Sequence, residues 1–221
     1  MKTALIQMVF LLAVCPAIMG SEGKFEVESN SLKLIDKGER TEFIGDVVMT
    51  RGKMRIKSDK VISSKKTDLL EASGKVEMNY SSDTVKVSSR CRRLTVDQGT
   101  RKIRLFDDVK ARITETLPEE VRAADVVSSG LEVDYAGTDI EAYFNGDVKM
   151  TSEEIEVNSE KAVYSKKAGT VVFSGAPSAR TYNDKHQAGY SGEIMSVSVS
   201  EMSFSIKGNA TARIRVYGTK M

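Results

Sequence analysis

The sequence holds few of the residues that most often carry out chemistry. Its 221 residues include no tryptophan, a single histidine and two cysteines. Structural zinc sites use four protein ligands, and a cysteine or serine nucleophile needs a base beside it. The chain does not supply such sets. We therefore expect no enzyme activity, no catalytic residue, no metal site and no cofactor.

The histidine and one cysteine lie in polar surroundings. His186 belongs to the polar segment 182–187, which has no second histidine, and is expected in a surface loop. Cys91 is flanked by Arg90 and Arg92, and positive neighbours favour a lowered thiol pKa. No candidate base accompanies it, so we interpret Cys91 as an incidental thiol.

An excess of charge of one sign is also lacking. The 33 lysines and arginines nearly balance 31 aspartates and glutamates, for a formal net charge of +2. This balance gives no general electrostatic reason to bind nucleic acid. The stretch from Arg90 to Arg104 is locally basic. Exposed cations there suit the phosphates of an anionic lipid headgroup, and equally an ordinary solvated strand face.

Long hydrophobic runs are absent except at the N-terminus. Residues 4–14 are largely apolar, follow a lysine and precede a polar segment. A run this short with a basic start is typical of a secretory signal peptide, here residues 1–20, with cleavage after Gly20 or alternatively after Ala17. The segment that ends at Cys15 resembles a lipoprotein acylation site, but the bulky residue before the cysteine favours the ordinary signal. We expect an exported protein.

The chain repeats itself at an offset of 101 residues. Segment 43–50 recurs as segment 144–151, and 13 of the 32 aligned positions that begin at Phe43 are identical without a gap. Ordinary residue usage would give roughly two identities by chance. The sequence therefore predicts a tandem duplication, with halves at about 25–125 and 126–221.

Apolar and polar residues alternate around six regularly spaced positions. Phe43, Val47 and Met49, for example, alternate with polar neighbours, which is typical of strands buried on one face. A glycine at the centre either permits a bulge or lets a ligand approach the backbone, and the one aspartate among the six favours the bulge. The pattern predicts a stack of short antiparallel strands. The six positions are Gly45, Gly74, Asp107, Gly146, Gly175 and Gly208.

Linkers are scarce in the sequence. The most irregular stretches are expected at residues 114–120 and 176–192. Residues 123–130, which separate the halves, are neither proline-rich nor low in complexity. A single continuous stack is therefore favoured over two tethered domains. Residues 25–28 and 212–217 do alternate, so each end of the stack is predicted to present an edge strand to which another chain can pair.

Two longer segments carry a family resemblance. The pattern Phe-x-Gly-Asp-Val-x-Met-Thr occurs at 43–50 and again at 144–151. Ile-Lys-Ser-Asp-Lys-Val follows the first copy at 56–61, and Val-Asn-Ser-Glu-Lys-Ala follows the second at 157–162. This arrangement resembles the OstA-like repeat of the LptA family of periplasmic lipopolysaccharide transport proteins. Weaker copies surround the other central positions, so the resemblance extends over the chain after residue 25.

The resemblance implies an all-β fold, an open and twisted β-jelly roll whose two sheets enclose an apolar groove. It implies that the protein shelters the acyl chains of lipopolysaccharide (lipid A) in the periplasm, during transport from the inner to the outer membrane. It also implies end-to-end homo-oligomers through edge strands, and contacts with inner- and outer-membrane transport components that carry OstA-like domains. The alternative is a structural, self-assembling β-repeat protein of the cell envelope without lipid cargo.

Apolar residues at strand spacing are the candidates for the lining of such a groove. The same pattern is typical of an ordinary filled core, so it leaves both arrangements open. Methionines among these residues have flexible side chains that adapt to irregular apolar shapes. The groove-lining candidates are Phe43, Met49, Ile56, Val148, Met150, Val157, Phe173, Phe204 and Ile206.

Overall fold

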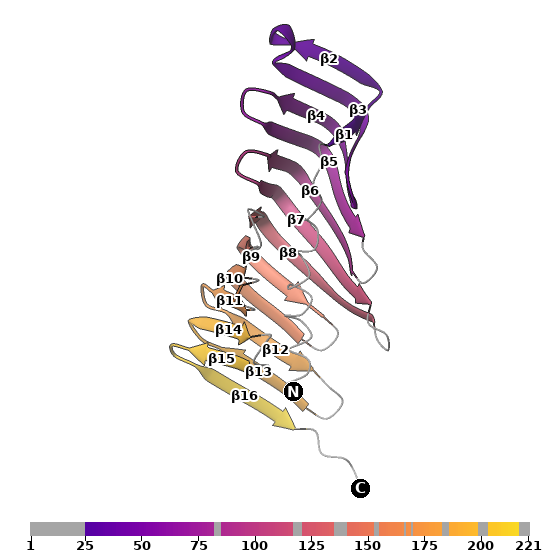
Figure 1. The fold of residues 1–221 in the computed structure, drawn as a ribbon. Helices are drawn as coiled ribbons and strands as arrows, with labels where there is room; N and C mark the ends of the chain where they lie inside the picture. The colour runs from indigo at the N-terminus through magenta and orange to yellow at the C-terminus, as the bar shows by residue number, and fades with distance from the viewer. Residues whose placement is uncertain are drawn as a thin grey trace.

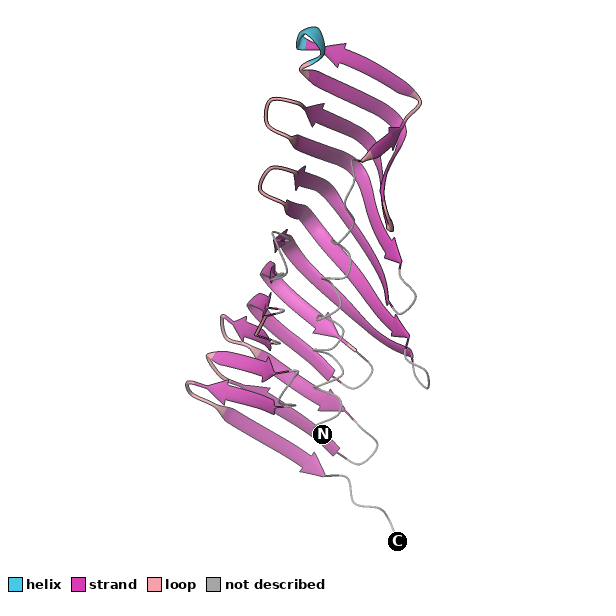
Figure 2. Cartoon of the chain, viewed as in Figure 1, coloured by secondary structure: helices cyan, strands magenta, loops and turns pink. Residues whose placement is uncertain are grey.

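The computed structural model describes residues 25–81, 85–116, 121–134, 141–152, 155–165, 167–168, 170–182, 186–198 and 203–216. The predicted leader, its cleavage sites and Cys15 lie outside the described residues. The described chain is almost entirely β-strand, with one short 3-10 turn at Asp36–Gly38. Its strands stack side by side along one long axis (Figures 1 and 2). The predicted all-β class is confirmed.

Sixteen strands are formed by the described residues. They are β1 (Glu26–Glu28), β2 (Ser31–Ile35), β3 (Arg40–Arg51), β4 (Met54–Ser64), β5 (Leu69–Ser81), β6 (Val85–Asp97), β7 (Lys102–Thr116), β8 (Val121–Asp134), β9 (Glu141–Thr151), β10 (Ile155–Ser165), β11 (Thr170–Ser174), β12 (Ser178–Tyr182), β13 (His186–Ser191), β14 (Ile194–Ser198), β15 (Ser203–Lys207) and β16 (Thr211–Val216). Each pairs antiparallel with its neighbours.

The long strands β3 to β10 each cross a bend and contribute to two layers. Residues 40–44 of β3 pair with β2, whereas residues 48–50 of the same strand pair with β1. In the same way, residues 161–165 of β10 pair with β11 and residues 155–158 pair with β12. Layer 1 therefore ends in β2 on one side and in β11, β14 and β15 on the other. Layer 2 ends in β1 and in β12, β13 and β16. This open arrangement confirms the predicted β-jelly roll.

The bends lie at the repeated glycine and aspartate positions. The pairing register between β3 and β4 shifts between Ile44 and Val47, next to Gly45. Gly74 has a φ of +98°, and a β-carbon there would collide with the Asp59 side chain of the neighbouring strand. Asp107 also adopts a positive φ, +64°, which aspartate tolerates better than most residues. The predicted bulge is therefore confirmed as the structural role of these positions.

A second series of residues stabilises the bends from the inside. Ser58, Ser128 and Ser159 each donate a side-chain hydrogen bond to the carbonyl oxygen two residues further on, at 3.2, 3.1 and 3.0 Å. The Cys91 thiol makes the same contact with the Arg93 carbonyl oxygen at 3.3 Å. These bonds satisfy carbonyl groups that the bulges release from the ladder. Serine recurs at this place in the sequence, but the alternation of apolar and polar residues does not reveal the series.

The strands differ from the short ones that the sequence predicts. Strands β3 to β10 contain 11 to 15 residues because the chain continues through each bend instead of ending there. The short strands are β1 and β2 at the N-terminal end and β11 to β16 towards the C-terminus. Strands β11 and β12 are separated at residues 175–177, where Pro177 offers no N–H group to the ladder.

The stretch 176–192 is not irregular, contrary to expectation. It contains β12 and β13, which pair with each other through residues 178–182 and 187–191. The inward-facing positions of these strands include Ala179 and Ala188, which are buried. Small inward residues give a weak hydrophobic alternation, and this explains why the pattern did not reveal the strands.

Strand bounds also recur at the 101-residue offset. Strand β3 begins at Arg40 and β9 at Glu141, while β4 and β10 begin at Met54 and Ile155. The continuous strand β5 corresponds to β11 plus β12, and β7 corresponds to β15 plus β16. Both halves therefore follow one plan of pairing. That they arose by tandem duplication stays a prediction.

Candidate functional site

Side chains that point between the two layers form one continuous apolar interior. In layer 2, Met49, Ile56 and Met78 are neighbours on successive strands. In layer 1, Leu94 and Leu105 are paired in the same way. All five side chains are buried and belong to a single cluster that includes residues from both layers. The interior is therefore a feature of the whole stack rather than of one strand pair.

All nine groove-lining candidates face or border this interior. In layer 2 these are Met49, Ile56, Val148, Met150 and Val157, all buried; in layer 1 Phe173 is buried, and Phe43, Phe204 and Ile206 are partly buried and pack against the cluster. Their inward orientation agrees with the role expected of them. Contact with a lipid stays a prediction.

The nine residues do not surround one pocket. Met49 lies opposite Ile56 near the N-terminal end of the stack, and Met150 lies opposite Val157 further along. Phe204 lies on the terminal strand β15. The candidates are thus spread along the long axis, as expected for an extended lining and not for a compact binding site.

The interior is closed in the middle and open at its ends. Leu105, in the central strand β7, is completely buried. Leu32 and Leu34 on β2 lie opposite Phe43 and Thr41 on the inner side of layer 1, yet they are 57% and 66% exposed. Ile214 on β16 is 60% exposed. Apolar surface of the interior therefore meets solvent at both ends of the described stack.

Two large aromatic side chains in the middle were not among the candidates. Phe144 and Tyr164 are among the largest fully buried side chains of the protein. Both come from the layer 1 portions of β9 and β10. Phe144 is the first residue of the second motif copy, so the motif could have identified it. Tyr164 was harder to identify from alternation, because tyrosine also occurs often at protein surfaces.

The Cys91 thiol faces the interior and is 8% exposed. Burial raises its pKa to about 11, opposite to the lowering that its arginine neighbours favour. Successive side chains of a strand point to opposite faces, so the arginine side chains lie outside.

His186, expected in a loop, is the first residue of β13.

The basic stretch from residue 90 to residue 104 does not form one patch. Arg92 pairs with Asp108 at a bend, with a distance of 2.8 Å between Nη2 and Oδ2. Arg93 stacks over the Phe106 ring at 4.5 Å from its centroid. Alternation and bending distribute the cations between the two outer faces and the bend.

Glu132 is the centre of an ion-pair network on the outer face of layer 1. Its carboxylate accepts hydrogen bonds from Arg104 Nε at 2.6 Å and from Lys102 Nζ at 2.8 Å. These donors hold the pKa of Glu132 below its usual value, and the bonds to Glu132 raise the pKa of Lys102 and of Arg104. The network joins strands β7 and β8, so the charged groups on this part of the outer face are paired with one another.

No group of three or more histidine, cysteine, aspartate or glutamate side chains in the described ranges is arranged to hold a metal ion. Within the same ranges, no helix has the length and apolar character needed to cross a membrane.

The open two-layer β-jelly roll with a continuous apolar interior defines a class of elongated β-proteins. A family described as LptA/(LptD N-terminal domain) LPS transport protein matches residues 26–136, which is half of the chain. The chain belongs to this family of lipopolysaccharide transport proteins. The resemblance seen in the repeated motifs is thereby confirmed.

Among solved structures, the chain is similar to LptH, the LptA homologous periplasmic component of the conserved lipopolysaccharide transport device from Pseudomonas aeruginosa. The sequences are 15% identical, the TM-score is 0.31, and the match covers 72% of this chain and 87% of that chain. No curated protein matches the chain.

Proposed function

We propose that the protein is an exported lipid-binding bridge that carries lipopolysaccharide across the periplasm. The observation that supports this most directly is the apolar interior, which runs the length of the stack and meets solvent at both ends. Family membership and the predicted export signal agree with the proposal. In this role the protein needs no catalytic residue, because the lipid is moved and not changed.

Acyl chains would lie between the two layers. Burial of one methylene group stabilises the complex by about 0.8 kcal/mol, so an acyl chain of about ten methylenes gains about 8 kcal/mol. Part of this gain offsets the contacts that the layers lose when the lipid separates them. Met49, Met78 and Met150 occupy inner positions of layer 2, and their unbranched side chains adapt readily to a new neighbour.

Photocrosslinking tests lipid binding with a matched pair of positions. Phe204 faces the interior at an open end, whereas Ser205, the next residue on β15, faces outward and is exposed. In cells that make lipopolysaccharide, a photoreactive amino acid should form a lipid adduct at 204 and not at 205. Equal lipid labelling at 204 and 205 contradicts the proposal. So does a result in which the photoreactive amino acid crosslinks only to protein, both at position 204 and at the buried position 144.

The protein would extend the bridge by end-to-end pairing of copies. The pairing of β7 with β8 inside the chain supplies a template for this contact, since β15 and β16 occupy the places of β7 at the 101-residue offset. Arg104 lies opposite Glu132 in that internal pairing. The same offset relates Ser205 to Arg104. In its pairing with β3, however, β2 is shifted by two residues from this offset, so Lys33 takes the place of Glu132. We expect Ser205 of one copy to lie opposite Lys33 of the next.

Cysteine crosslinking tests this register. In a Cys91→Ser background, Lys33→Cys combined with Ser205→Cys should give ladders of crosslinked oligomers with a short bismaleimide. Lys33→Cys combined with Thr211→Cys is the control, since Thr211 lies in layer 2. A strict monomer at high concentration would exclude end-to-end assembly without bearing on lipid binding by a single copy.

The second candidate function is a structural β-repeat protein without cargo. The complete burial of central residues such as Leu105 favours it, because a filled core already satisfies these side chains. Native mass spectrometry of protein purified from its own envelope separates the two functions. Bound lipid that is lost on delipidation supports the bridge, and protein that carries no lipid supports the structural role.

A further inference from the structure

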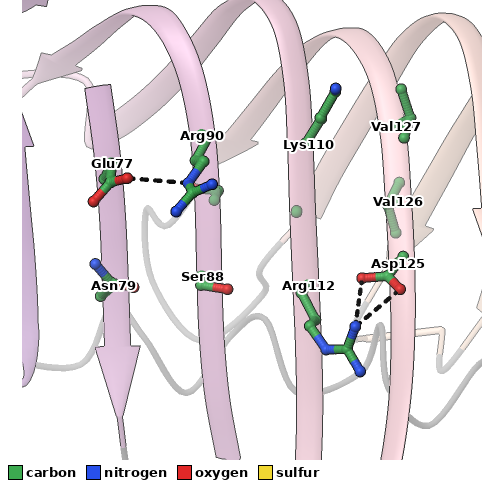
Figure 3. Close-up of a pocket in the computed structure, with 11 residues that line it drawn as sticks. Glu77, Asn79, Ser88, Arg90, Lys110, Arg112, Asp125, Val126 and Val127 are labelled. Carbon is green, nitrogen blue, oxygen red and sulfur yellow. Dashed lines mark hydrogen bonds and ion pairs between the residues drawn. The ribbon is translucent and has the colours of Figure 1, made fainter. Parts of the chain in front are cut away.

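We propose that the outer face of layer 2 carries a binding site for a phosphate-class anion, formed by Arg90, Lys110 and Arg112. These side chains surround a hollow of about 350 Å³ over strands β5 to β8, on the opposite side of the layer from the apolar interior (Figure 3). The site is separate from the proposed lipid path and does not depend on it.

The first reason is that cations are placed directly beside one another. Arg90 on β6 and Lys110 on β7 are cross-strand partners, and Arg112 lies two residues further along the same face of β7. Like charges directly opposite in a sheet destabilise it, since their β-carbons are only about 5 Å apart. A bound anion between them removes this cost.

The second reason is that the cations are incompletely neutralised. Arg90 pairs with Glu77 through its Nε atom at 3.0 Å, and Arg112 pairs with Asp125 through Nη1 at 3.2 Å (Figure 3). The described residues provide no ion pair for Lys110, whose other neighbour across the sheet is Val127. A guanidinium has five N–H donors, so both arginines retain donors beyond their carboxylate bonds.

The third reason is that the fold does not need these charges. At the 101-residue offset, Ser191 and Thr211 take the places of Arg90 and Lys110 and are likewise cross-strand partners. Their hydroxyl groups are hydrogen-bonded to each other at 2.6 Å. The same strand pairing is thus built with a neutral pair, so the cationic pair is an addition to the first half.

The geometry suits a compact anion with several oxygens. A phosphate or sulfate group in the hollow can accept hydrogen bonds from the Lys110 ammonium and from the remaining guanidinium donors at once. The group can be a free inorganic ion or the phosphomonoester of a lipid headgroup. Both sources offer the same chemistry to the three side chains.

Substitutions that copy the second half of the chain test the site. Lys110→Thr and Arg90→Ser introduce the residues found at the equivalent positions, which should preserve the fold. Arg213→Ser is the matched control, because Arg213 is the exposed counterpart of Arg112 on the same outer face. Circular dichroism and unfolding midpoints check that all three variants fold. The probes are inorganic phosphate, followed by calorimetry, and phosphatidylcholine vesicles with or without phosphatidic acid, followed by sedimentation.

The loss of one charge-assisted contact should weaken binding about tenfold in Lys110→Thr and in Arg90→Ser, and change it less than about twofold in Arg213→Ser. This result with inorganic phosphate identifies a small-anion site. The same result with phosphatidic acid vesicles alone identifies a lipid headgroup as the source. Equal weakening by Arg213→Ser indicates diffuse surface charge and overturns the proposal, as does the absence of binding to both probes.

Discussion

The thiol of Cys91 donates a hydrogen bond to the carbonyl oxygen of Arg93, at the place where serine hydroxyls stabilise the other bends. In β4, the Ser58 hydroxyl donates the equivalent hydrogen bond to the carbonyl oxygen of Lys60. The lone cysteine of the described chain is therefore one member of a structural series. Cys91 lies between two arginines in the sequence, but its thiol is not in a basic environment, because those arginine side chains point to the other side of the strand.

This relationship predicts that Cys91→Ser is tolerated. Serine supplies the same donor at a site where the protein already uses serine three times. Cys91→Ala, in contrast, leaves the Arg93 carbonyl oxygen without this partner and should cost about 1 kcal/mol. Urea unfolding of the two variants measures the difference. A serine variant less stable than the alanine variant would contradict the assigned role.

The raised pKa of Cys91 predicts that the protein loses stability at alkaline pH. The folded-state pKa of about 11 exceeds the ordinary value of 9.0, so the unfolded chain ionises first as the pH rises. The stabilisation is fully present below pH 9 and is lost between pH 9 and about pH 11. Allowing for partial solvation, the wild type should lose about 1 to 2 kcal/mol more than Cys91→Ser across this range. If the unfolding free energies of the two proteins fell equally between pH 9 and about pH 11, a buried thiol would be excluded.

Much of the fold could be predicted from the sequence because its signals are local. Alternation around Phe43 and Val47 identifies a strand with one buried face, and Gly45 identifies the bulge within it. The continuity of β3 to β10 through the bends is not local. It depends on whether the chain keeps pairing on both sides of the bulge. A glycine alone is equally compatible with a bulge inside a strand and with the end of a strand.

The candidate site could be predicted only in part for a related reason. Inward orientation of Met150 or Val157 follows from period-two alternation. Exposure does not, because it depends on how many strands lie beyond a residue: Leu105 is covered on every side, whereas Leu34 lies at the end of the stack. Arg90 and Lys110 are likewise brought together by strand register, and no sequence spacing marks them as neighbours.

Gly74 should be sensitive to any side chain. Its φ of +98° is strained for other residues, and a β-carbon would collide with Asp59. Gly74→Ala is expected to cost about 2 kcal/mol, whereas Gly99→Ala, at a turn with room for a methyl group, should change stability by less than about 0.5 kcal/mol. Adding Asp59→Ala to Gly74→Ala should recover only part of the loss, since the backbone strain persists. Thermal unfolding of the four proteins tests this.

Glu132→Gln should reduce the acid sensitivity of the protein. The pKa of Glu132 is lowered in the folded state by Arg104 and Lys102, so its stabilisation is present above about pH 4.5 and is lost as the pH falls through the folded-state pKa. The side chains are partly exposed, so the effect at neutral pH should stay below about 1 kcal/mol. Urea midpoints between pH 3 and 7 should therefore fall less steeply in the variant. An unchanged slope would show that the network contributes nothing to acid stability.

The closed middle and the open ends of the interior predict unequal effects of the same substitution. Leu105→Ala removes three carbons from a completely buried side chain and should cost about 2 to 4 kcal/mol. Leu34→Ala removes the same atoms from a side chain that is 66% exposed and should cost less than about 1 kcal/mol. Dilute protein is needed for the measurement, because pairing of copies would bury Leu34 and add a dependence on concentration. Equal losses in both dilute variants would mean that the N-terminal end is covered in the isolated molecule. A larger cost for Leu34→Ala at high concentration than at low would show that another copy covers it.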